Sequence, residues 1–206
     1  MTPAAVVWDI GNVLIGWQPE RFYDERIGDA ARRALFAAVD LHAMHARIDA
    51  GAPFRDTVEA TAAERPDWAA EIRLWHDRWE DLAGPALPRS VRLLQALLAR
   101  GVRCFALSNF ASDPFARSLA VHPFLGRFDR LFLSGPMGVT KPDPAIYARL
   151  EAETGIAPAA LLFTDDRAEN VAAAAARGWQ THLFDGADGW AARLVAAGLL
   201  TEQETA

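Results

Sequence analysis

Carboxylates follow two apolar runs of the sequence at the point where each run ends. Asp9 follows the run 4–8, and Asp165 and Asp166 follow the run 161–164. Continuous apolar runs of this length are typical of buried parallel strands. The carboxyl ends of such strands meet at one edge of an open α/β sheet, where ligands bind. Three carboxylates at that edge repel one another unless a cation lies between them, and oxygen ligands favour Mg²⁺.

Hydroxyl, amide and ammonium groups occupy similar positions in the sequence. Ser108 and Asn109 follow the apolar run 102–107, and Lys141 lies in the loop after the run 131–133. A lysine at that place can direct its ammonium group towards the same sheet edge. Any one of these residues alone is typical of a solvated loop, so the prediction of a shared site rests on their convergence.

Five apolar runs separated by helical segments organise most of the chain. They span residues 4–8, 102–107, 131–133, 161–164 and 179–183. Between them lie segments of helical periodicity, and Asp113 and Asp143 each precede a proline in the way that an N-cap residue does. Strands that alternate with helices form βαβ units, so we expect an α/β protein with a Rossmann-like parallel sheet.

Residues 17–83 interrupt this alternation and contain no strand-like run. The helical spacing of apolar residues predicts helices instead, one of them through Leu35, Val39 and Met44. Four of the seven tryptophans lie in this block: Trp17, Trp68, Trp75 and Trp79. They either pack the interior of the block or, in one or two cases, line a substrate cleft.

These residues, in this order, resemble the four motifs of the haloacid dehalogenase-like (HAD) hydrolases, and the resemblance covers nearly the whole chain. The matching segments are 9–14, Ser108 with Asn109, Lys141 before Pro142, and Asp165 with Asp166 and Asn170. Their order, spacing and placement after strands are together specific. The resemblance implies a core of residues 1–16 and 84–206, with residues 17–83 as an inserted helical cap of the C1 type, as in subfamily IA.

The resemblance also implies a nucleophile and a metal. It makes the chain a Mg²⁺-dependent phosphatase that hydrolyses a small phosphate monoester, such as a sugar phosphate, through an aspartyl-phosphate. Asp9 matches the nucleophile. Mg²⁺ would be held by Asp9, the carbonyl group of Gly11 and Asp166, with Asp165 acting directly or through water.

Further residues are implied to act on the substrate. Lys141 and the hydroxyl group of Ser108 would bind the transferred phosphoryl group and stabilise its developing charge. Asn109 would shape the loop of the second motif beside the substrate. Asn170 would orient a metal-bound water molecule or a carboxylate.

One position departs from the family pattern. Phosphatases of the family usually carry a second aspartate two residues after the nucleophile as general acid and base, and this chain has Gly11 there. Bacterial hexose-1-phosphate phosphatases, which this chain resembles, share the sequence Asp-x-Gly-Asn-Val. General acid catalysis contributes about 10²–10⁴-fold. Either the substrate has a leaving group that needs little protonation, or another residue supplies the proton.

The helical block offers candidates for that proton donor. His42, His45 and Asp49 fall on one face of an expected helix. A packed or solvated face, contact with the substrate and a second metal site all remain open for these three residues.

Two other functions are compatible with parts of the pattern. A 2-haloacid dehalogenase would use Asp9 to attack carbon without a metal, but its fourth motif usually carries Ser-Asn and its first motif an aromatic residue where Gly11 lies. A non-catalytic phosphometabolite-binding domain is supported only by the missing acid. The retained Asp9, Lys141 and acidic pair argue against it.

Composition excludes several classes of protein. The chain has 206 residues, 51% of them hydrophobic, and a formal net charge of −6. An acidic chain is a poor ligand for nucleic acid or an anionic membrane. The single cysteine, Cys104, cannot form an internal disulfide. With no apolar run of about 20 residues and no basic leader, we expect a cytoplasmic protein, as a monomer or a homodimer.

Overall fold

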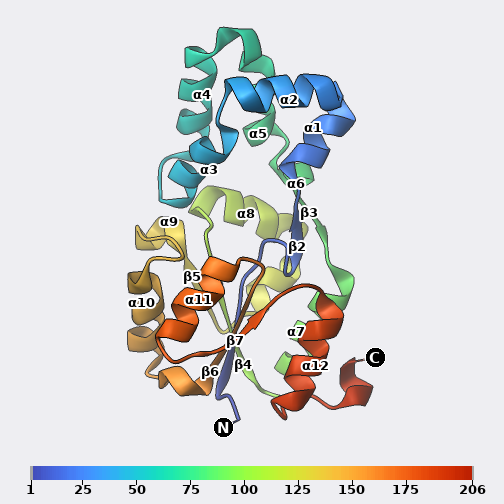
Figure 1. Ribbon diagram of the computed structural model, residues 1–206, viewed down its shortest axis with the longest axis vertical. Helices are drawn as coiled ribbons and strands as arrows, with labels where there is room; N and C mark the ends of the chain where they lie inside the picture. Colours follow the sequence, from blue (N-terminus) through green and yellow to red (C-terminus); the bar gives the residue numbers. More distant parts are fainter. Residues whose placement is uncertain (1, 206) are drawn as a thin grey trace.

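A parallel sheet of five strands organises the lower part of the computed structural model, which describes residues 2–205 (Figure 1). The strand order is β5-β4-β1-β6-β7, so β1 lies in the centre. The strands are β1 (Ala5–Trp8), β4 (Arg103–Ser108), β5 (Arg130–Leu133), β6 (Leu161–Asp165) and β7 (Gln180–Leu183). Each predicted apolar run overlaps one of these strands, which confirms the α/β fold with a parallel core.

Successive residues of the central strand β1 face opposite layers of helices. Val6 and Trp8 belong to a hydrophobic cluster with α7 and α12, whereas Ala5 and Val7 belong to a second cluster with α10 and α11. The helices are α7 (Pro88–Ala99), α10 (Pro144–Thr154), α11 (Ala168–Ala176) and α12 (Ala187–Ala196). Because both faces are covered, every residue of β1 is apolar and buried.

Six helices form the upper part of the molecule (Figure 1). They are α1 (Pro19–Ile27), α2 (Asp29–Ala38), α3 (Leu41–Asp49), α4 (Phe54–Glu64), α5 (Ala69–Asp77) and α6 (Trp79–Leu82), with a 3₁₀ turn, η1, at Pro66–Trp68. Two antiparallel strands, β2 (Ile15–Trp17) and β3 (Ala83–Ala86), carry the chain into and out of these helices. We refer to α1–α6 as the helical unit.

The expected helix through Leu35, Val39 and Met44 is wrong. Val39 is extended and separates α2 from α3. Asp40 then caps α3, because its side chain accepts a hydrogen bond from the backbone N–H of Ala43 at 2.8 Å. A good N-cap residue begins a new helix here even though the apolar spacing continues across the break.

The two predicted aspartate caps differ in outcome. Asp143 caps α10 and accepts a hydrogen bond from the backbone N–H of Ala145 at 2.8 Å. Asp113 is not a cap, because α8 (Ser112–Val121) begins one residue before it. Asp113 lies instead in the first turn of α8, where a negative charge is favourable to the helix dipole.

Contacts at α9 (Ser134–Met137) tie the helical unit to the sheet core. The buried hydroxyl group of Ser134 donates to the carbonyl oxygen of Asp49 at 2.5 Å and accepts from the N–H of Phe110 at 2.9 Å. A Cβ atom on Gly51 would lie 3.0 Å from the carbonyl oxygen of Gly135. The C-terminal end of α3 is therefore fixed against the core. The remaining 3₁₀ turns are η2 (Pro123–Arg127), η3 (Pro158–Ala160) and η4 (Glu202–Thr205).

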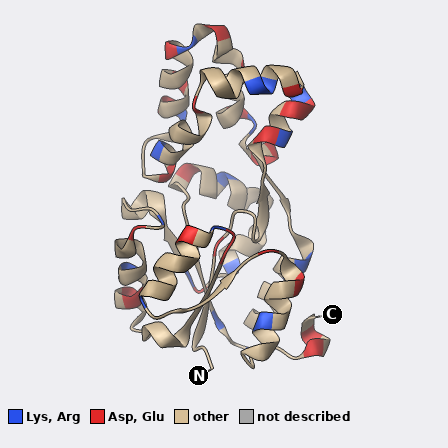
Figure 2. Ribbon diagram, in the orientation of Figure 1, with Lys and Arg blue, Asp and Glu red and all other residues tan. Residues whose placement is uncertain are grey.

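Acidic and basic residues are interspersed over the helices of both parts (Figure 2). Several form ion pairs, such as Arg117 with Glu80 at 2.7 Å and Arg26 with Asp81 at 2.7 Å. Within residues 2–205, no helix combines the length and apolar character that a bilayer crossing requires.

The hydroxyl group of Ser134 connects two parts of the molecule, so its removal should destabilise the fold. In Ser134→Ala the N–H of Phe110 and the carbonyl group of Asp49 both lose a partner. We expect the free energy of unfolding to fall by about 1–3 kcal/mol, measured by urea denaturation. Ser112→Ala, at an exposed position, is the control and should change it by less than about 0.5 kcal/mol. Equal effects of the two substitutions would contradict this role of Ser134.

Candidate active site

The carboxyl ends of three neighbouring strands bring the predicted site residues together. Asp9 follows β1, Ser108 ends β4 and Asp165 ends β6, and the parallel pairing of β1 with both neighbours places these ends side by side. A cavity of about 360 Å³ lies over this edge, and the helical unit forms its opposite wall. The predicted site residues that line the cavity are Asp9, Gly11, Ser108, Asn109, Lys141, Asp166 and Asn170.

A buried ammonium group joins two of the carboxylates. Lys141 Nζ lies 2.8 Å from Asp9 Oδ1 and 2.6 Å from Asp165 Oδ2, and its side chain is 1% exposed. Burial alone would lower the pKa of Lys141, but the two adjacent carboxylates raise it above its ordinary value. Lys141 therefore keeps its positive charge inside the protein.

Asp9 is held in one orientation. Ser108 Oγ donates a hydrogen bond to Asp9 Oδ1 at 2.7 Å, and the ammonium group of Lys141 approaches the same oxygen. Burial raises the pKa of Asp9 to about 6, although Lys141 lowers it. Because both contacts are made to Oδ1, they leave Oδ2 for other partners.

Asp165 has contacts on both of its carboxylate oxygens. Besides Lys141, its partners are the side-chain amide of Asn170, at 2.9 and 3.1 Å, and the backbone N–H of Arg167, at 2.8 Å. A carboxylate has about four sites for such donors, and these four contacts use them. Asp165 is fully buried and lies behind the cavity wall, where it positions Lys141.

Asn109 connects the loop after β4 to the loop that carries Lys141. Its side-chain amide donates to the carbonyl oxygen of Lys141 at 3.0 Å, and its Oδ1 accepts from the backbone N–H of Lys141 at 2.7 Å. This reciprocal pair fixes the two loops relative to each other.

The sequence-based prediction missed Asn12. This residue has a φ of 54°, in the left-handed region that Asn tolerates better than most residues. Its Nδ2 donates to Asp166 Oδ2 at 3.0 Å, and its Oδ1 accepts from the N–H of Trp17 at 2.9 Å. Burial raises the pKa of Asp166, whereas this hydrogen bond from Asn12 lowers it. The Gly-Asn pair that lies three and four residues after the end of β1 is the signal that could have indicated this tight turn.

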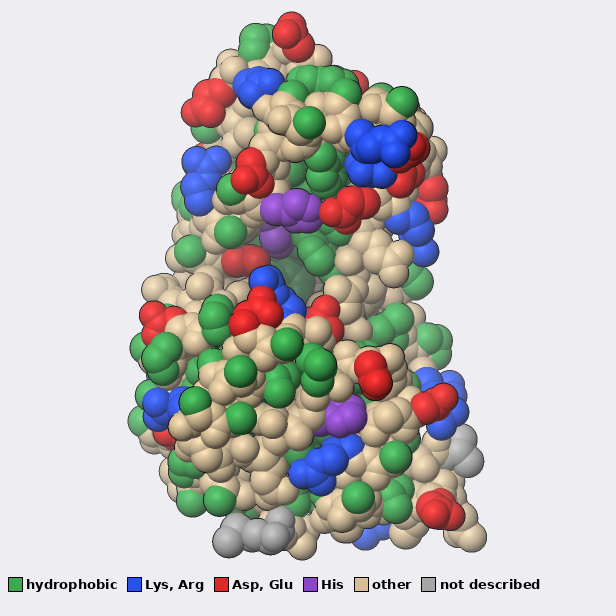
Figure 3. All heavy atoms as spheres, in the orientation of Figure 1, with side chains coloured by type: hydrophobic (Ala, Val, Ile, Leu, Met, Phe, Trp, Pro, Cys, Tyr) green, Lys and Arg blue, Asp and Glu red, His purple; other side chains and the backbone are tan. Residues whose placement is uncertain are grey.

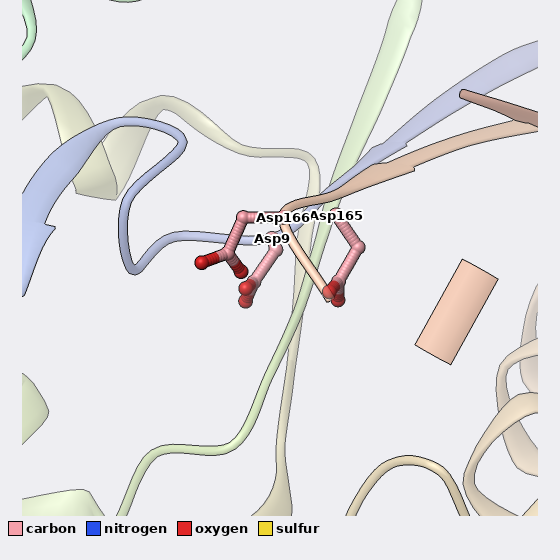
Figure 4. A group of neighbouring side chains, drawn as sticks. All are labelled: Asp9, Asp165 and Asp166. Carbon is pink, nitrogen blue, oxygen red and sulfur yellow. The ribbon is translucent and has the colours of Figure 1, made fainter. Parts of the chain in front are cut away.

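The three carboxylates fit a divalent cation. Asp9, Asp165 and Asp166 each offer an oxygen atom, and these atoms lie within 4.8 Å of one another. In Figure 4 the carboxylates of Asp9 and Asp166 lie towards each other, while that of Asp165 is directed to the other side. Hard oxygen donors of this kind suit Mg²⁺.

Stacked aromatic rings form the wall that the helical unit contributes. The ring of His45 stacks against Trp17, with centroids 4.7 Å apart, and against Trp79, at 5.6 Å, and the two tryptophan rings also contact each other. Trp17 and Trp79 line the cavity, whereas Trp75 is fully buried behind them and donates a hydrogen bond to His45 Nδ1 at 3.3 Å. The tryptophans of this block therefore divide between the cavity wall and the interior.

The helix face predicted from His42, His45 and Asp49 points into the cavity, since all three residues line it. Figure 3 shows histidine side chains at the edge of a hollow between the helical unit and the sheet core. The polar groups of the sheet edge and those of α3 thus face one cavity from opposite sides.

The fold is a Rossmann-like α/β fold, and a cluster of carboxylates and a lysine lies at the carboxyl end of its central strand. Residues 3–178 match the haloacid dehalogenase-like hydrolases, and the chain belongs to that family. The resemblance found in the motifs is thereby confirmed. The subfamily and the likeness to hexose-1-phosphate phosphatases stay predictions.

Two curated relatives are phosphatases. The chain is 33% identical over 98 residues to the sesquiterpene phosphatase astK of Aspergillus oryzae, which covers 47% of this chain and 50% of that protein. It is 28% identical over 138 residues to phosphoserine phosphatase of Thermus thermophilus, which covers 65% of this chain and 55% of that protein. The chain thus matches about half the length of these relatives.

Solved structures share the fold. A HAD family enzyme from Bacteroides thetaiotaomicron superimposes with a TM-score of 0.67 at 22% identity, over 88% of this chain and 93% of that one. The same enzyme has been solved in complex with magnesium and inorganic phosphate, with a TM-score of 0.63. At this identity the likeness shows the fold alone and does not separate phosphatase from dehalogenase chemistry.

The buried carboxylate of Asp9 should make the metal-free protein less stable as pH rises. The folded-state pKa of about 6 exceeds the ordinary value of 3.8. Between these values the folded state binds more protons than the unfolded state, so the free energy of unfolding falls as pH increases from about 4 to about 6. Asp9→Asn removes this titration and should make the decline shallower than in the wild-type protein. Urea denaturation in EDTA across this range measures it, and parallel profiles would contradict the assignment.

Proposed function

We propose that this protein is a Mg²⁺-dependent phosphatase that transfers the phosphoryl group of a small phosphate monoester to Asp9 and then to water. One observation carries the proposal. The hydroxyl group of Ser108 and the ammonium group of Lys141 both contact one carboxylate oxygen, Asp9 Oδ1, on the floor of a cavity. The phosphatase relatives support it.

Asp9 acts as the nucleophile in this scheme. Ser108 and Lys141 hold Oδ1, which fixes the direction in which the carboxylate meets the phosphorus atom. A bond forms between a carboxylate oxygen of Asp9 and phosphorus as the bond from phosphorus to the leaving group breaks. Ser108 and Lys141 stabilise negative charge on the phosphoryl oxygens, with Asn109 holding the lysine loop in place. Water then attacks the aspartyl-phosphate and releases inorganic phosphate.

The metal would be held by Asp9, the carbonyl group of Gly11 and Asp166. Bound Mg²⁺ lowers the repulsion between an anionic nucleophile and an anionic substrate. Asp165 would act indirectly, by holding Lys141 beside Asp9, because Lys141, Asn170 and Arg167 already use its oxygens. Asn170 orients Asp165. The magnesium and phosphate complex of the Bacteroides enzyme supports this choice of metal.

The helical unit would serve as a cap of the C1 type. In this assignment residues 17–83 are the cap and residues 1–16 and 84–206 are the hydrolase core. The chain crosses between them through β2 and β3, where a Cβ atom on Gly16 would lie 3.0 Å from the carbonyl oxygen of Gly84. The two crossings lie side by side, as a hinge requires, and closure about them would exclude water from the cavity.

The cavity suits a small organic group. Its volume of about 360 Å³ and its wall of tryptophan and histidine rings fit a compact leaving group, for which a sugar is one candidate. A dehalogenase is less compatible, because Gly11 and the Asp165–Asp166 pair differ from its usual motifs.

Phosphate release from 4-nitrophenyl phosphate tests the proposal. We expect turnover that requires Mg²⁺ and that falls by at least about 10³-fold in Asp9→Asn, because the nucleophile is lost. Asp188→Asn makes the same chemical change at an exposed position and should keep wild-type turnover. Metal-independent turnover, or full activity in Asp9→Asn, would exclude this mechanism.

Binding of a phosphoryl mimic provides a test that does not need turnover. Mg²⁺ with BeF₃⁻ at about 100 times its Kd should stabilise the folded protein by about 2.7 kcal/mol. For a chain of this size that raises the Tm by about 5–10 °C. Asp9→Asn should show no such shift in a thermal unfolding experiment, because it cannot form the acyl-phosphate mimic. The same shift in both proteins would place the mimic elsewhere.

A further inference from the structure

The phosphatase reaction proposed above names no residue that protonates the leaving group. The inference drawn from this gap rests on that proposed function. Family phosphatases usually carry an aspartate where this chain has Gly11. Glycine has no side chain, so the proton must come from another residue that faces the cavity or the leaving group must depart without one. On the helical unit, the titratable residues that line the cavity are His42, His45 and Asp49.

The two histidines are poorly suited to donate this proton. The indole N–H of Trp75 can only donate, so His45 Nδ1 accepts from it and the ring proton lies on Nε2. Burial lowers the pKa of His45 to about 3, and the nearby His42 adds to the effect. His45 is therefore neutral, and a neutral imidazole is a weak acid. His42 is about half exposed and its Nε2 lies 2.9 Å from Glu20 Oε1.

The carboxyl group of Asp49 is largely buried, but only one of its oxygens has a polar neighbour in the described part of the chain. Its side chain is 13% exposed, and its Oδ2 lies 3.4 Å from His45 Nε2. Its Oδ1 is buried and finds no hydrogen-bond partner among residues 2–205. A buried polar atom left without a hydrogen bond destabilises the folded protein, so its presence beside a cavity indicates a role towards a bound molecule.

The backbone of Asp49 is fixed against the catalytic core. Ser134 donates to its carbonyl oxygen at 2.5 Å, and the backbones of Gly51 and Gly135 approach closely just beyond it. The carboxyl group is thus held across the cavity from Asp9 by a contact between the two parts of the molecule. Precise placement of this kind is what proton transfer to a substrate atom requires.

We propose that Asp49 is the general acid and base that replaces the aspartate missing at position 11. As Asp9 forms its bond to phosphorus, the carboxyl proton of Asp49 passes to the leaving-group oxygen, and the alcohol departs. In the second step the Asp49 carboxylate takes a proton from the water molecule that attacks the aspartyl-phosphate. Inorganic phosphate leaves, and Asp9 and protonated Asp49 are restored.

The surroundings of Asp49 favour the protonated form before the reaction. Burial raises the pKa of Asp49 well above its ordinary range, and the negative charge of Asp9 adds to this, while Lys141 opposes it. The Nε2–H of His45, fixed in that tautomer by Trp75, faces Asp49 Oδ2. It can donate to the carboxylate that exists between the two steps.

A pair of substrates that differ in leaving group separates proton donation from other roles of Asp49. 4-Nitrophenyl phosphate releases a weakly basic phenolate, whereas benzyl phosphate, of similar size, releases a strongly basic alkoxide. Asp49→Asn keeps the shape of the side chain but removes the transferable proton. We expect kcat/KM for benzyl phosphate to fall by about 10²–10⁴-fold and that for 4-nitrophenyl phosphate by less than about 10-fold.

The control is Asp56→Asn, the same change at an exposed position of the helical unit, which should leave both substrates unaffected. Near-normal turnover of the aryl ester also shows that Asp49→Asn is folded. If that variant does not fold, Asp49→Ser provides the same comparison.

Equal losses for both substrates, or no loss for either, would overturn the assignment of Asp49. If wild-type protein with Mg²⁺ hydrolyses neither ester, the proposed phosphatase fails and the role of Asp49 fails with it.

Discussion

The structure around the site depends on one buried ion cluster, in which the ammonium group of Lys141 lies between the carboxylates of Asp9 and Asp165. Buried charges are costly unless they are paired and hydrogen-bonded, and removing one partner leaves the others uncompensated. The hydrogen bonds of Ser108, Asn109 and the other neighbouring polar groups can be understood as the support that this cluster requires. The carboxylates of Asp9 and Asp165 carry two negative charges and Lys141 carries one positive charge, so the cluster has an excess of negative charge. Asp166 adds to this excess, which makes the edge of the sheet suited to a cation.

The sheet supplies this cluster with rigid supports. Asp9 follows the central strand, which is paired on both sides and covered on both faces, so its position is among the most constrained in the molecule. Lys141, by contrast, is carried by a loop. Its placement depends on the two hydrogen bonds with Asn109 and on Asp165, and these contacts link the carboxyl ends of β4 and β6 to the loop. A rigid carboxylate beside a loop held by several specific contacts gives the precision that the proposed in-line phosphoryl transfer requires.

The parallel sheet and the convergence at its edge could be predicted from the sequence because both depend on short, local patterns. A run such as 161–164 shows that a strand is buried on both faces, and Asp165 shows where it ends. The break between α2 and α3 could not be predicted from apolar spacing, since Leu35 and Met44 are buried on either side of it. The full set of hydrogen bonds to the Asp165 carboxylate could not be predicted from the sequence either, nor could the hydrogen bonds by which Asn12 joins Asp166 to Trp17. The contact of Lys141 with Asp165 and that of Asn12 with Asp166 both join residues distant in sequence, and each forms only when two loops meet.

The position of Asp49 has a consequence for how the site would work. An acid placed two residues after the nucleophile belongs to the same loop and is present whenever the core is folded. Asp49 instead ends a helix of the helical unit, and it is held near Asp9 by the contact of its backbone with Ser134. If Asp49 supplies the proton, the reaction needs this contact as well as the core. Proton donation is then coupled to the docking of the helical unit, so that the phosphoryl group is transferred only when the cavity is closed to water.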